Sequence, residues 1–420
     1  MAIPVRVRSL WSSGFARQVS ETYLTRLFVV ALGFVNSILV TRILGPEGRG
    51  LFAVANTLSA TGVQLGNLGL QSSNTYYVSR DSRALPVLLG NSLVVSGGFG
   101  IVVLAAFFLL QLRPELAPIS GRLLALTFVA IPAGLVSLLL QNLLIGTQQI
   151  HAYNVIDLTT RVLAVLLVAA TAPLGLVSPE LIFALVLVTV VFGVVWSFLR
   201  LKTQLQGPVS WSFETLRTCL PYGLRAYFGS LFVFLVLKSD IVLVTYMRGA
   251  TETGYYSIAV GLADILLMLP MVVGTILFPK LSAAPDLATR WTLVRRVLRV
   301  MVPATLVGLV VTHFAAGPLI RLAYGAAFDP STAAVFWLLP GIGFYAVNTI
   351  LMNFLASCGM PLVVVYSPFL ALLVNVAANL WLVPSLGFVG AAVSSSLAYG
   401  LMLLMSIVHI RFRLLRDLRA

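Results

Sequence analysis

Charged residues are scarce in this chain. Of its 420 residues only 10% are Asp, Glu, Lys or Arg, whereas 59% are hydrophobic. Soluble domains carry about 25% charged residues, which cover their surface with polar groups. The low charge and the mean hydropathy of +1.01 therefore exclude an ordinary soluble protein and predict a protein of the lipid bilayer.

Twelve long apolar runs separated by short polar hinges are the main pattern of the sequence. A helix needs about 20 apolar residues to cross the hydrocarbon core, and a helix satisfies its own backbone groups there. We predict an all-α polytopic membrane protein with twelve transmembrane helices, at residues 22–43, 51–78, 86–112, 122–146, 153–177, 179–200, 220–247, 253–279, 297–316, 331–356, 361–384 and 387–410.

Cysteine and histidine are also rare, with two and three residues respectively. Cys219 and Cys358 fall near span ends that we expect to face the cytoplasm, where disulfides are not expected, and the histidines are far apart in the sequence. A phosphate-binding loop of the Walker type is absent. These features argue against a disulfide scaffold, a metal site, a cofactor and ATP hydrolysis by this chain.

Basic residues in the connections indicate the orientation. Most of them fall in the two tails and in the connections after the second, sixth and eighth spans, so we predict that both termini are cytoplasmic. The same bias accounts for the net charge of +14. Because these residues are scattered over short loops, they do not indicate nucleic-acid binding.

The chain repeats itself with a spacing of 204 residues, which takes Gly50 to Gly254. Residues 39–45 align with residues 243–249 at this spacing. Each half then has six spans and enters the membrane in the same sense, and such halves place the ligand site between them. We predict an N-lobe and a C-lobe of six helices each around a central cavity, over residues 1–206 and 207–420.

Short motifs occur in a fixed order along nearly the whole chain. They are Thr41–Gly50 (TRILGPEGRG), Leu68–Leu70, Tyr76–Arg80, Lys238–Asp240, Gly254–Ser257, Leu262–Asp264, Leu269-Pro270, Phe278–Leu281 and Tyr324-Gly325-x2-Phe328. In this order they resemble the polysaccharide-biosynthesis flippases of the multidrug/oligosaccharidyl-lipid/polysaccharide (MOP) exporter superfamily.

The resemblance implies two six-helix lobes and translocation of undecaprenyl-pyrophosphate-linked oligosaccharides across the bacterial inner membrane. These lipids are precursors of O-antigen, capsule or exopolysaccharide, and polymerase or assembly proteins are the implied partners. Lipid II flippases of this superfamily typically have fourteen spans. The twelve spans predicted here therefore favour the O-antigen and exopolysaccharide group.

Four basic residues lie inside predicted spans and are our candidates for binding a pyrophosphate: Arg26, Arg161, Arg225 and Lys238. A basic side chain that faces lipid at mid-helix costs about 2.5–3.5 kcal/mol, so the deeper ones should face protein or water. Arg26 and Arg225 lie about one helical turn from span ends, and snorkelling to the interface is the alternative for both.

Three acidic residues inside spans, Asp157, Asp240 and Asp264, are candidates for ion or proton coupling. Asp157 precedes Arg161 by four residues, a spacing that predicts an ion pair on one helix face. Lys238 and Asp240 are two residues apart and project about 200° from one another. They therefore cannot both face the cavity, and one of them should brace a neighbouring helix. A buried structural role is the alternative for Asp264.

Amide side chains recur on the second span at gaps that place them on one helix face. We predict that they line the cavity and bind sugar hydroxyls, together with two amides of the C-lobe; the residues are Asn56, Gln64, Asn67, Gln71, Asn74, Asn348 and Asn375, with Asn379 one turn beyond the last. Hydrogen bonding between helices is the alternative role for these groups.

Three functions are compatible with this pattern. The first is a lipid-linked oligosaccharide flippase that works by alternating access. The second is a small-molecule exporter of the same superfamily, for which an acidic, aromatic lumen is expected rather than intramembrane arginine. The third is a membrane polysaccharide polymerase, which typically carries a large periplasmic loop that this chain lacks. We favour the flippase and expect no enzymatic activity.

Overall fold

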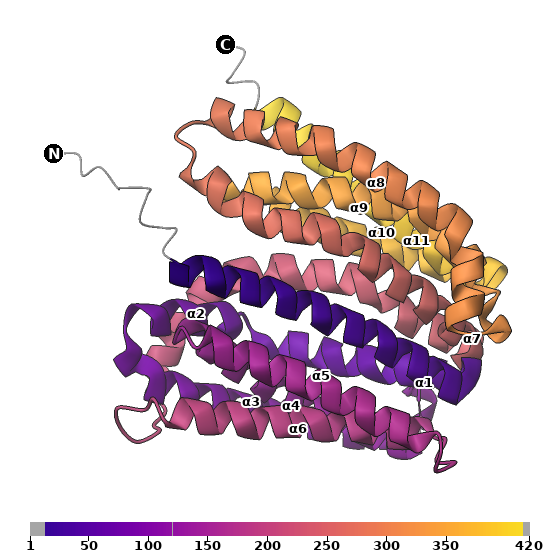
Figure 1. The fold of residues 1–420 in the computed structure, drawn as a ribbon, viewed down its shortest axis with the longest axis horizontal. Helices are drawn as coiled ribbons and strands as arrows, with labels where there is room; N and C mark the ends of the chain where they lie inside the picture. The colour runs from indigo at the N-terminus through magenta and orange to yellow at the C-terminus, as the bar shows by residue number, and fades with distance from the viewer. Residues whose placement is uncertain (1–12, 120, 415–420) are drawn as a thin grey trace. The chain divides into compact units, whose positions relative to one another are not determined.

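The computed structural model describes residues 13–119 and 121–414. Within these ranges the ordered elements are helices: α1 (Ser13–Asn67), α2 (Leu70–Arg80), α3 (Leu85–Leu112), α4 (Gly121–Gly146), α5 (Ile150–Thr171), α6 (Pro179–Lys202), α7 (Phe213–Ala283), α8 (Leu287–Ala323), α9 (Ser331–Ser357), α10 (Val363–Leu386) and α11 (Phe388–His409), with short turns of other helix types between some of them (Figure 1).

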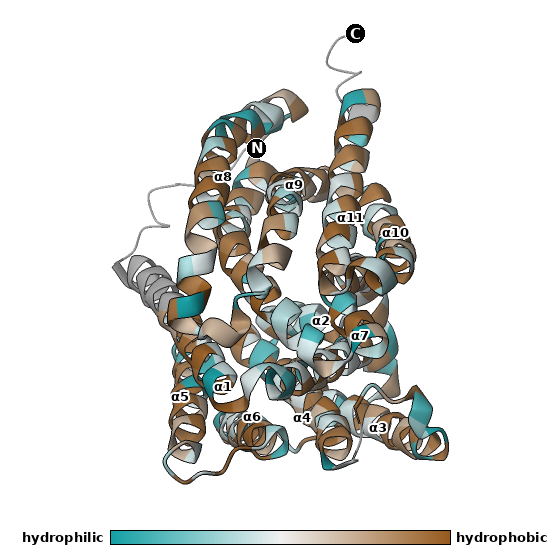
Figure 2. Ribbon diagram, turned by 90° about the vertical axis from the view of Figure 1, so that its right-hand side faces the viewer, coloured by the Kyte–Doolittle hydropathy of each residue, from teal (hydrophilic) through white to brown (hydrophobic). Residues whose placement is uncertain are grey.

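Ten of the described helices are long and apolar enough to cross a membrane. Hydrophobic residues cover most of their length, and hydrophilic residues form short patches (Figure 2). Most helix bounds agree with the predicted spans to within a few residues. The fifth span is shorter than expected, because α5 ends at Thr171 and the chain turns there through the glycine-containing loop before α6.

Two helices, α1 and α7, are 55 and 71 residues long, far more than one crossing needs. Each bends sharply at a glycine, with φ 67° and ψ −174° at Gly45 and φ 83° and ψ −178° at Gly249. A positive φ is readily adopted by glycine, which has no Cβ. Each long helix therefore consists of two arms, and with the arms counted separately the predicted twelve spans are present in the described residues.

The two bends lie 204 residues apart, at equivalent positions of the predicted repeat, and have nearly the same dihedral angles. The repeat read from the sequence therefore recurs in the backbone. The second span is not one helix, however. It is interrupted at Leu68 and Gly69, whose φ angles are 48° and 79°, and continues as α2.

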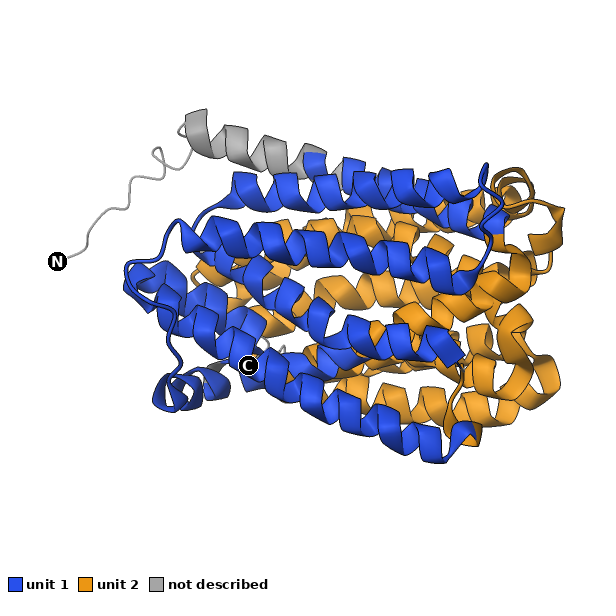
Figure 3. Cartoon of the chain, turned by 90° about the horizontal axis from the view of Figure 1, so that it is seen from below, with its two compact units in different colours: residues 1–43, 62–114, 120–225 blue, residues 44–61, 115–119, 226–420 orange. Residues whose placement is uncertain are grey.

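The chain divides into two compact units (Figure 3). Unit 1 comprises residues 1–43, 62–114 and 120–225, and unit 2 comprises residues 44–61, 115–119 and 226–420. Three of the borders fall inside α1 and α7, so each of these helices contributes to both units, and the other two fall in the connection between α3 and α4. The lobe limits at residues 206 and 207 remain a prediction.

In unit 1, helix α4 packs against α2, α3 and α6, and α5 packs against α6. Leucines of α3 and α4 form most of the core, with Val78, Ile156, Leu201 and Cys219 beside them. The beginning of α7 is fastened to this unit, because Leu216 and Leu220 pack against the buried leucines of α2 and α4.

Asn91 of α3 fixes the backbone just before α7. Its Nδ2 donates to the Ser212 carbonyl at 3.1 Å, and its Oδ1 accepts from the Ser212 amide at 2.9 Å. Close by, a Cβ on Gly90 would lie 2.0 Å from the Ser210 carbonyl oxygen, so only glycine permits this approach. The connection between the two halves of the sequence is thus tightly held to α3.

We expect Asn91→Ala to lower the free energy of unfolding by about 1–3 kcal/mol, because the Ser212 backbone groups lose both partners where they are partly buried. The measurement is thermal denaturation of the purified protein in detergent. Asn56→Ala is the control, since the Asn56 side chain donates to the Phe52 carbonyl of its own helix. Equal melting temperatures for the two variants would contradict the prediction.

In unit 2, helix α9 packs against α8 and α11, and α10 packs against α11. One core cluster joins α7, α8, α9 and the helical turn after α11 through Leu281, Val294, Ile350, Phe354 and Ile410. Arg290 at the start of α8 donates to the carbonyls of Ala284 and Ser357 and so caps the ends of α7 and α9.

The arms of α1 and α7 that follow the two bends cross at glycines within unit 2. A Cβ on Gly50 would lie 1.7 Å from the Ala250 carbonyl oxygen, and a Cβ on Gly254 would lie 2.0 Å from the Pro46 carbonyl oxygen. Because Pro46 and Ala250 are equivalent in the repeat, the same backbone contact is made twice. Beside this crossing, Arg49 Nε donates to Ser257 Oγ at 3.1 Å.

Candidate functional site

A buried carboxylate lies inside unit 2. Asp240, on the first arm of α7, is only 1% exposed. Its Oδ2 accepts from the Tyr256 hydroxyl at 2.9 Å and from Ser395 Oγ, and its Oδ1 accepts from Asn379 Nδ2 at 2.9 Å. The partners come from the second arm of α7, from α10 and from α11, so the cluster ties three helices together.

Asp240 has no basic partner among the ion pairs of the described residues. A buried carboxylate without a cation is costly unless donors surround it or it binds a proton or a cation. The three donors provide part of that compensation. Asp240 is therefore a buried acid held by hydrogen-bond donors rather than by a basic side chain of the described residues.

Two further amides complete this cluster. Asn375 Oδ1 accepts from Asn379 Nδ2 at 3.2 Å and from Ser239 Oγ at 3.4 Å. In the part of the chain that the structure describes, the Nδ2 of Asn375 and the Oδ1 of Asn379 are buried without a hydrogen-bond partner. The Asn379 oxygen can accept from water or coordinate a cation, and the Asn375 Nδ2 can donate to water or an anion.

Lys238 projects away from Asp240, as the two-residue spacing predicted, and pairs with Asp264 on the second arm of α7. The distance between Lys238 Nζ and Asp264 Oδ2 is 2.8 Å, and the side chains are 26% and 52% exposed. The ionisable side chains of Tyr345 on α9 and Tyr399 on α11 lie in the neighbourhood of Asp264. Two acids of unit 2 thus lie in opposite environments, one buried and one accessible.

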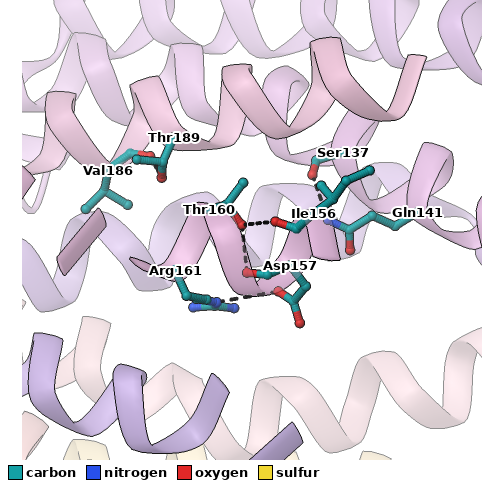
Figure 4. Close-up of polar contacts among 8 residues, drawn as sticks. All are labelled: Ser137, Gln141, Ile156, Asp157, Thr160, Arg161, Val186 and Thr189. Atoms are coloured by element: carbon teal, nitrogen blue, oxygen red, sulfur yellow. Dashed lines mark hydrogen bonds and ion pairs between the residues drawn. The ribbon is translucent and has the colours of Figure 1, made fainter. Parts of the chain in front are cut away.

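In unit 1, the predicted pair of Asp157 and Arg161 on α5 is confirmed, with 3.6 Å between Arg161 Nε and Asp157 Oδ1. The Arg161 side chain is 56% exposed and that of Asp157 is 14% exposed. Figure 4 shows both side chains pointing away from the helix that carries Val186 and Thr189, while Thr160 bonds to the carbonyls of its own helix. This pair offers an accessible guanidinium within a spanning helix.

The amide row of the second span is not one continuous face, and this correction follows from the break at Leu68 and Gly69. Asn67 precedes the break, is buried, and its Oδ1 accepts from the Gln71 backbone amide at 3.1 Å. Asn74 follows the break, is buried, and donates to Ser92 Oγ at 2.8 Å. These two amides serve the helix ends and helix packing. Asn56, Gln64 and Gln71 are half-buried.

The predicted amides of the C-lobe are also buried. Asn348 accepts from Ser406 Oγ at 2.7 Å, and Asn375 belongs to the Asp240 cluster. The side chains of Arg26 and Arg225 lie outside the residues that the structure describes. The structure therefore brings Lys238 together with Asp264, and Asp240 together with Asn375, but it leaves the grouping of all four basic residues as a prediction.

Sequence reasoning missed Tyr256 and Ser395, which bind Asp240, and Tyr345 and Tyr399 beside Asp264. Tyr256 lies in the motif Gly254–Ser257, 16 residues after Asp240. This spacing does not predict a contact unless the bend at Gly249 is known. Ser395 lies in a run of three serines in a helix, which is a general packing signal in membranes. None of these residues stands out by type.

Comparison with known proteins relates this arrangement to transporters. The family described as "polysaccharide biosynthesis protein" matches residues 15–284. Comparison with curated protein sequences gave no match.

Solved structures with the same fold include "Lipid II flippase MurJ, inward closed conformation", with a TM-score of 0.73, 15% identity and coverage of 94% of this chain and 88% of that chain. An inward-facing multidrug resistance MATE family transporter of the MOP superfamily has a TM-score of 0.73 and 15% identity, with coverage of 93% and 95%. A MOP superfamily transporter from Pyrococcus furiosus has a TM-score of 0.66 and 15% identity, with coverage of 96% of both chains.

The family match covers more than half of the chain, and the solved structures share its all-helical, two-lobed fold over nearly its full length. The chain is therefore a multi-pass membrane protein that belongs to the polysaccharide biosynthesis protein family, with the fold of the MOP superfamily.

Proposed function

We propose that the protein is a flippase for undecaprenyl-pyrophosphate-linked oligosaccharides, the precursors of O-antigen, capsule or exopolysaccharide. The observation that carries the proposal is the accessibility of the charged pairs Arg161–Asp157 and Lys238–Asp264 within spanning helices. Charged side chains inside a membrane face water-filled or polar surroundings rather than acyl chains. A polar path of this kind suits an anionic head group and its glycan while the prenyl tail stays in lipid.

Arg161 and Lys238, with Arg26 and Arg225, are the proposed ligands of the pyrophosphate. The half-buried amides Asn56, Gln64 and Gln71 are proposed to bond the glycan, with Asn67, Asn74, Asn348 and Asn375 supporting the helices around them. The lobes would alternate between inward and outward openings of a central cavity. The protein would work in the bacterial cytoplasmic membrane with both termini in the cytoplasm, next to polymerase or assembly proteins.

Asp240 is the proposed coupling group of the transport cycle. Its burial, its three donors and the unpartnered amide atoms of Asn375 and Asn379 support a site that takes up a proton or an ion in one state of the cycle. Asp157 and Asp264 are proposed to act at the basic residues with which they pair. No catalytic residue is assigned, because a flippase moves its substrate without changing it.

The proposal is tested by complementation of a deletion strain of the source bacterium. We expect Arg161→Ala and Lys238→Ala to reduce surface polysaccharide at least tenfold at unchanged protein level in the membrane, because each removes a cation from the pyrophosphate path. Arg83→Ala is the control, since Arg83 lies in a loop and is 80% exposed. Normal polysaccharide in the deletion strain itself would refute the proposed substrate class.

A MATE-like exporter of small molecules is the second candidate, because a MATE transporter shares the fold with the same TM-score of 0.73. Expression in a host that lacks its own drug pumps separates the two functions. Resistance to cationic drugs, together with unchanged polysaccharide in the deletion strain, would favour the exporter.

A further inference from the structure

The Arg248–Glu252 ion pair spans the bend of α7, and a second ion pair joins the two arms farther from the bend. Lys238 lies eleven residues before the bend at Gly249, and Asp264 lies fifteen residues after it. The 2.8 Å contact is a charge-assisted hydrogen bond. Both side chains are partly exposed, so a ligand or a proton that reaches one of them also reaches the other.

The surroundings of Asp264 contain few other ionisable groups. Tyr345 on α9 and Tyr399 on α11 are its electrostatic neighbours, and Lys238 is its ion-pair partner. Helix α8 packs against the same arm, where a Cβ added at Gly308 would lie 4.0 Å from Leu266 Cδ2. The titratable residue of α8 nearest to Gly308 in the sequence is His313, whose ring contacts Phe314 and Phe336. Among the ion pairs of the described residues, Lys238 is the basic partner of Asp264.

We propose that the Asp264 carboxylate competes with an anionic ligand for Lys238, so that a pyrophosphate-bearing ligand binds Lys238 as Asp264 takes up a proton. This inference rests on the proposed function and adds the means by which anion binding is coupled to protons. In the structure the Asp264 carboxylate accepts a hydrogen bond from the Lys238 ammonium group. In the complex a phosphate oxygen would take the place of that carboxylate.

The reason is electrostatic. A phosphate that displaces the Asp264 carboxylate would leave two anionic groups within a few ångströms of one another beside one ammonium, and like charges at that distance repel. Protonation removes that repulsion: a proton from water forms the O–H bond on Asp264, and the Lys238 N–H then donates to phosphate. Asp240 is not suited to this exchange, because it is fully buried and has no basic partner in the described residues.

The proton linkage fixes the direction of the pH effect. If one proton is taken up for each anion bound, the affinity rises as the pH falls, by about tenfold per pH unit as long as Asp264 is ionised in the free protein.

The experiment measures binding of a short-chain prenyl-pyrophosphate-linked N-acetylglucosamine to the full chain in lipid nanodiscs between roughly pH 5.5 and 8.5. A pyrophosphate diester keeps its charge over this range. We expect the Kd of the wild type to rise by up to about tenfold per pH unit, one proton for each ligand. Asp264→Asn should bind more tightly than the wild type at high pH and with a flat pH profile.

Three variants complete the test. Lys238→Ala should bind weakly with a flat profile, and Asp264→Glu should retain the slope because it keeps the carboxylate. Asp329→Asn is the matched control, because Asp329 forms an exposed pair with Arg321 at 4.0 Å outside this region, and it should behave like the wild type. Melting temperatures verify that each variant is folded. If Asp264→Asn does not fold, Asp264→Glu provides the test.

The outcomes separate the inference from the proposed function. Measurable binding with a flat profile in the wild type, or a slope that persists in Asp264→Asn, would overturn the exchange and leave the flippase proposal standing. Absence of binding in both the wild type and Asp264→Asn would overturn the anion site at Lys238 and the exchange with it.

Discussion

Alanine at Gly50 or Gly254 is expected to prevent the protein from reaching a stable fold. The added methyl group would lie 1.7 Å or 2.0 Å from a backbone carbonyl oxygen of the other arm, whereas ordinary contacts are about 3.5 Å or more. The opposing atoms belong to helix backbones and cannot rotate away as a side chain can. Overpacking costs about 1–3 kcal/mol where side chains adjust, and we expect the upper end or more here, with loss of transport.

Fluorescence-detected size exclusion and thermal denaturation in detergent measure this effect. Gly97→Ala and Gly98→Ala are the matched controls, because these glycines lie in the membrane helix α3 and an added Cβ would have nothing within 4 Å. The controls should keep or slightly raise the melting temperature, since alanine favours helix over glycine. A Gly50→Ala protein as stable as Gly97→Ala would show that the crossing is not tightly packed.

Substitution of Asp240 is expected to produce the largest functional loss. Asp240→Ala removes three hydrogen bonds to a carboxylate, from Tyr256, Ser395 and Asn379, and a hydrogen bond to a charged group contributes about 1.5–3 kcal/mol. This variant should therefore be destabilised by several kcal/mol. Asp240→Asn keeps the size and one carbonyl acceptor, while the two hydroxyl groups can turn to accept from the new amide. It should fold but fail to support surface polysaccharide, because it cannot change its charge.

Complementation of the deletion strain and melting temperatures in detergent together distinguish the two effects. Asp286→Asn serves as the control for loss of an acidic group, since Asp286 caps α8 by accepting the Thr289 amide outside the spanning region. The control should complement fully with a small change in stability. Full complementation by Asp240→Asn would remove Asp240 from the coupling mechanism and leave it a structural role.

The spans were predictable from the sequence because their cause is local. The thickness of the bilayer sets a length of about 20 apolar residues, and each helix meets that requirement within its own segment. The Asp157–Arg161 pair was predictable for the same reason, since a spacing of four residues decides which side chains meet on one helix.

Contacts between distant segments were not predictable. Lys238 and Asp264 meet because the chain reverses at Gly249, and the partners Asn379 and Ser395 reach Asp240 from 139 and 155 residues away. The prediction that the amides share one helix face failed at Leu68, where the helix breaks. The sequence carries no local signal for a leucine with positive φ. A polar residue on a helix face therefore indicates that it has a partner, but not whether the partner is a helix or a substrate.

The glycine crossing also bears on how such a chain could arise. In a two-fold symmetric dimer, residue i of one subunit contacts residue j of the other, and residue j contacts residue i. Gly50 contacts Ala250, and Gly254 contacts Pro46. When 204 is subtracted from the residue numbers of the second half, both contacts become the pair 50 and 46. The crossing is thus an isologous interface within one polypeptide, as expected if two copies of a half-length, self-associating ancestor were fused end to end.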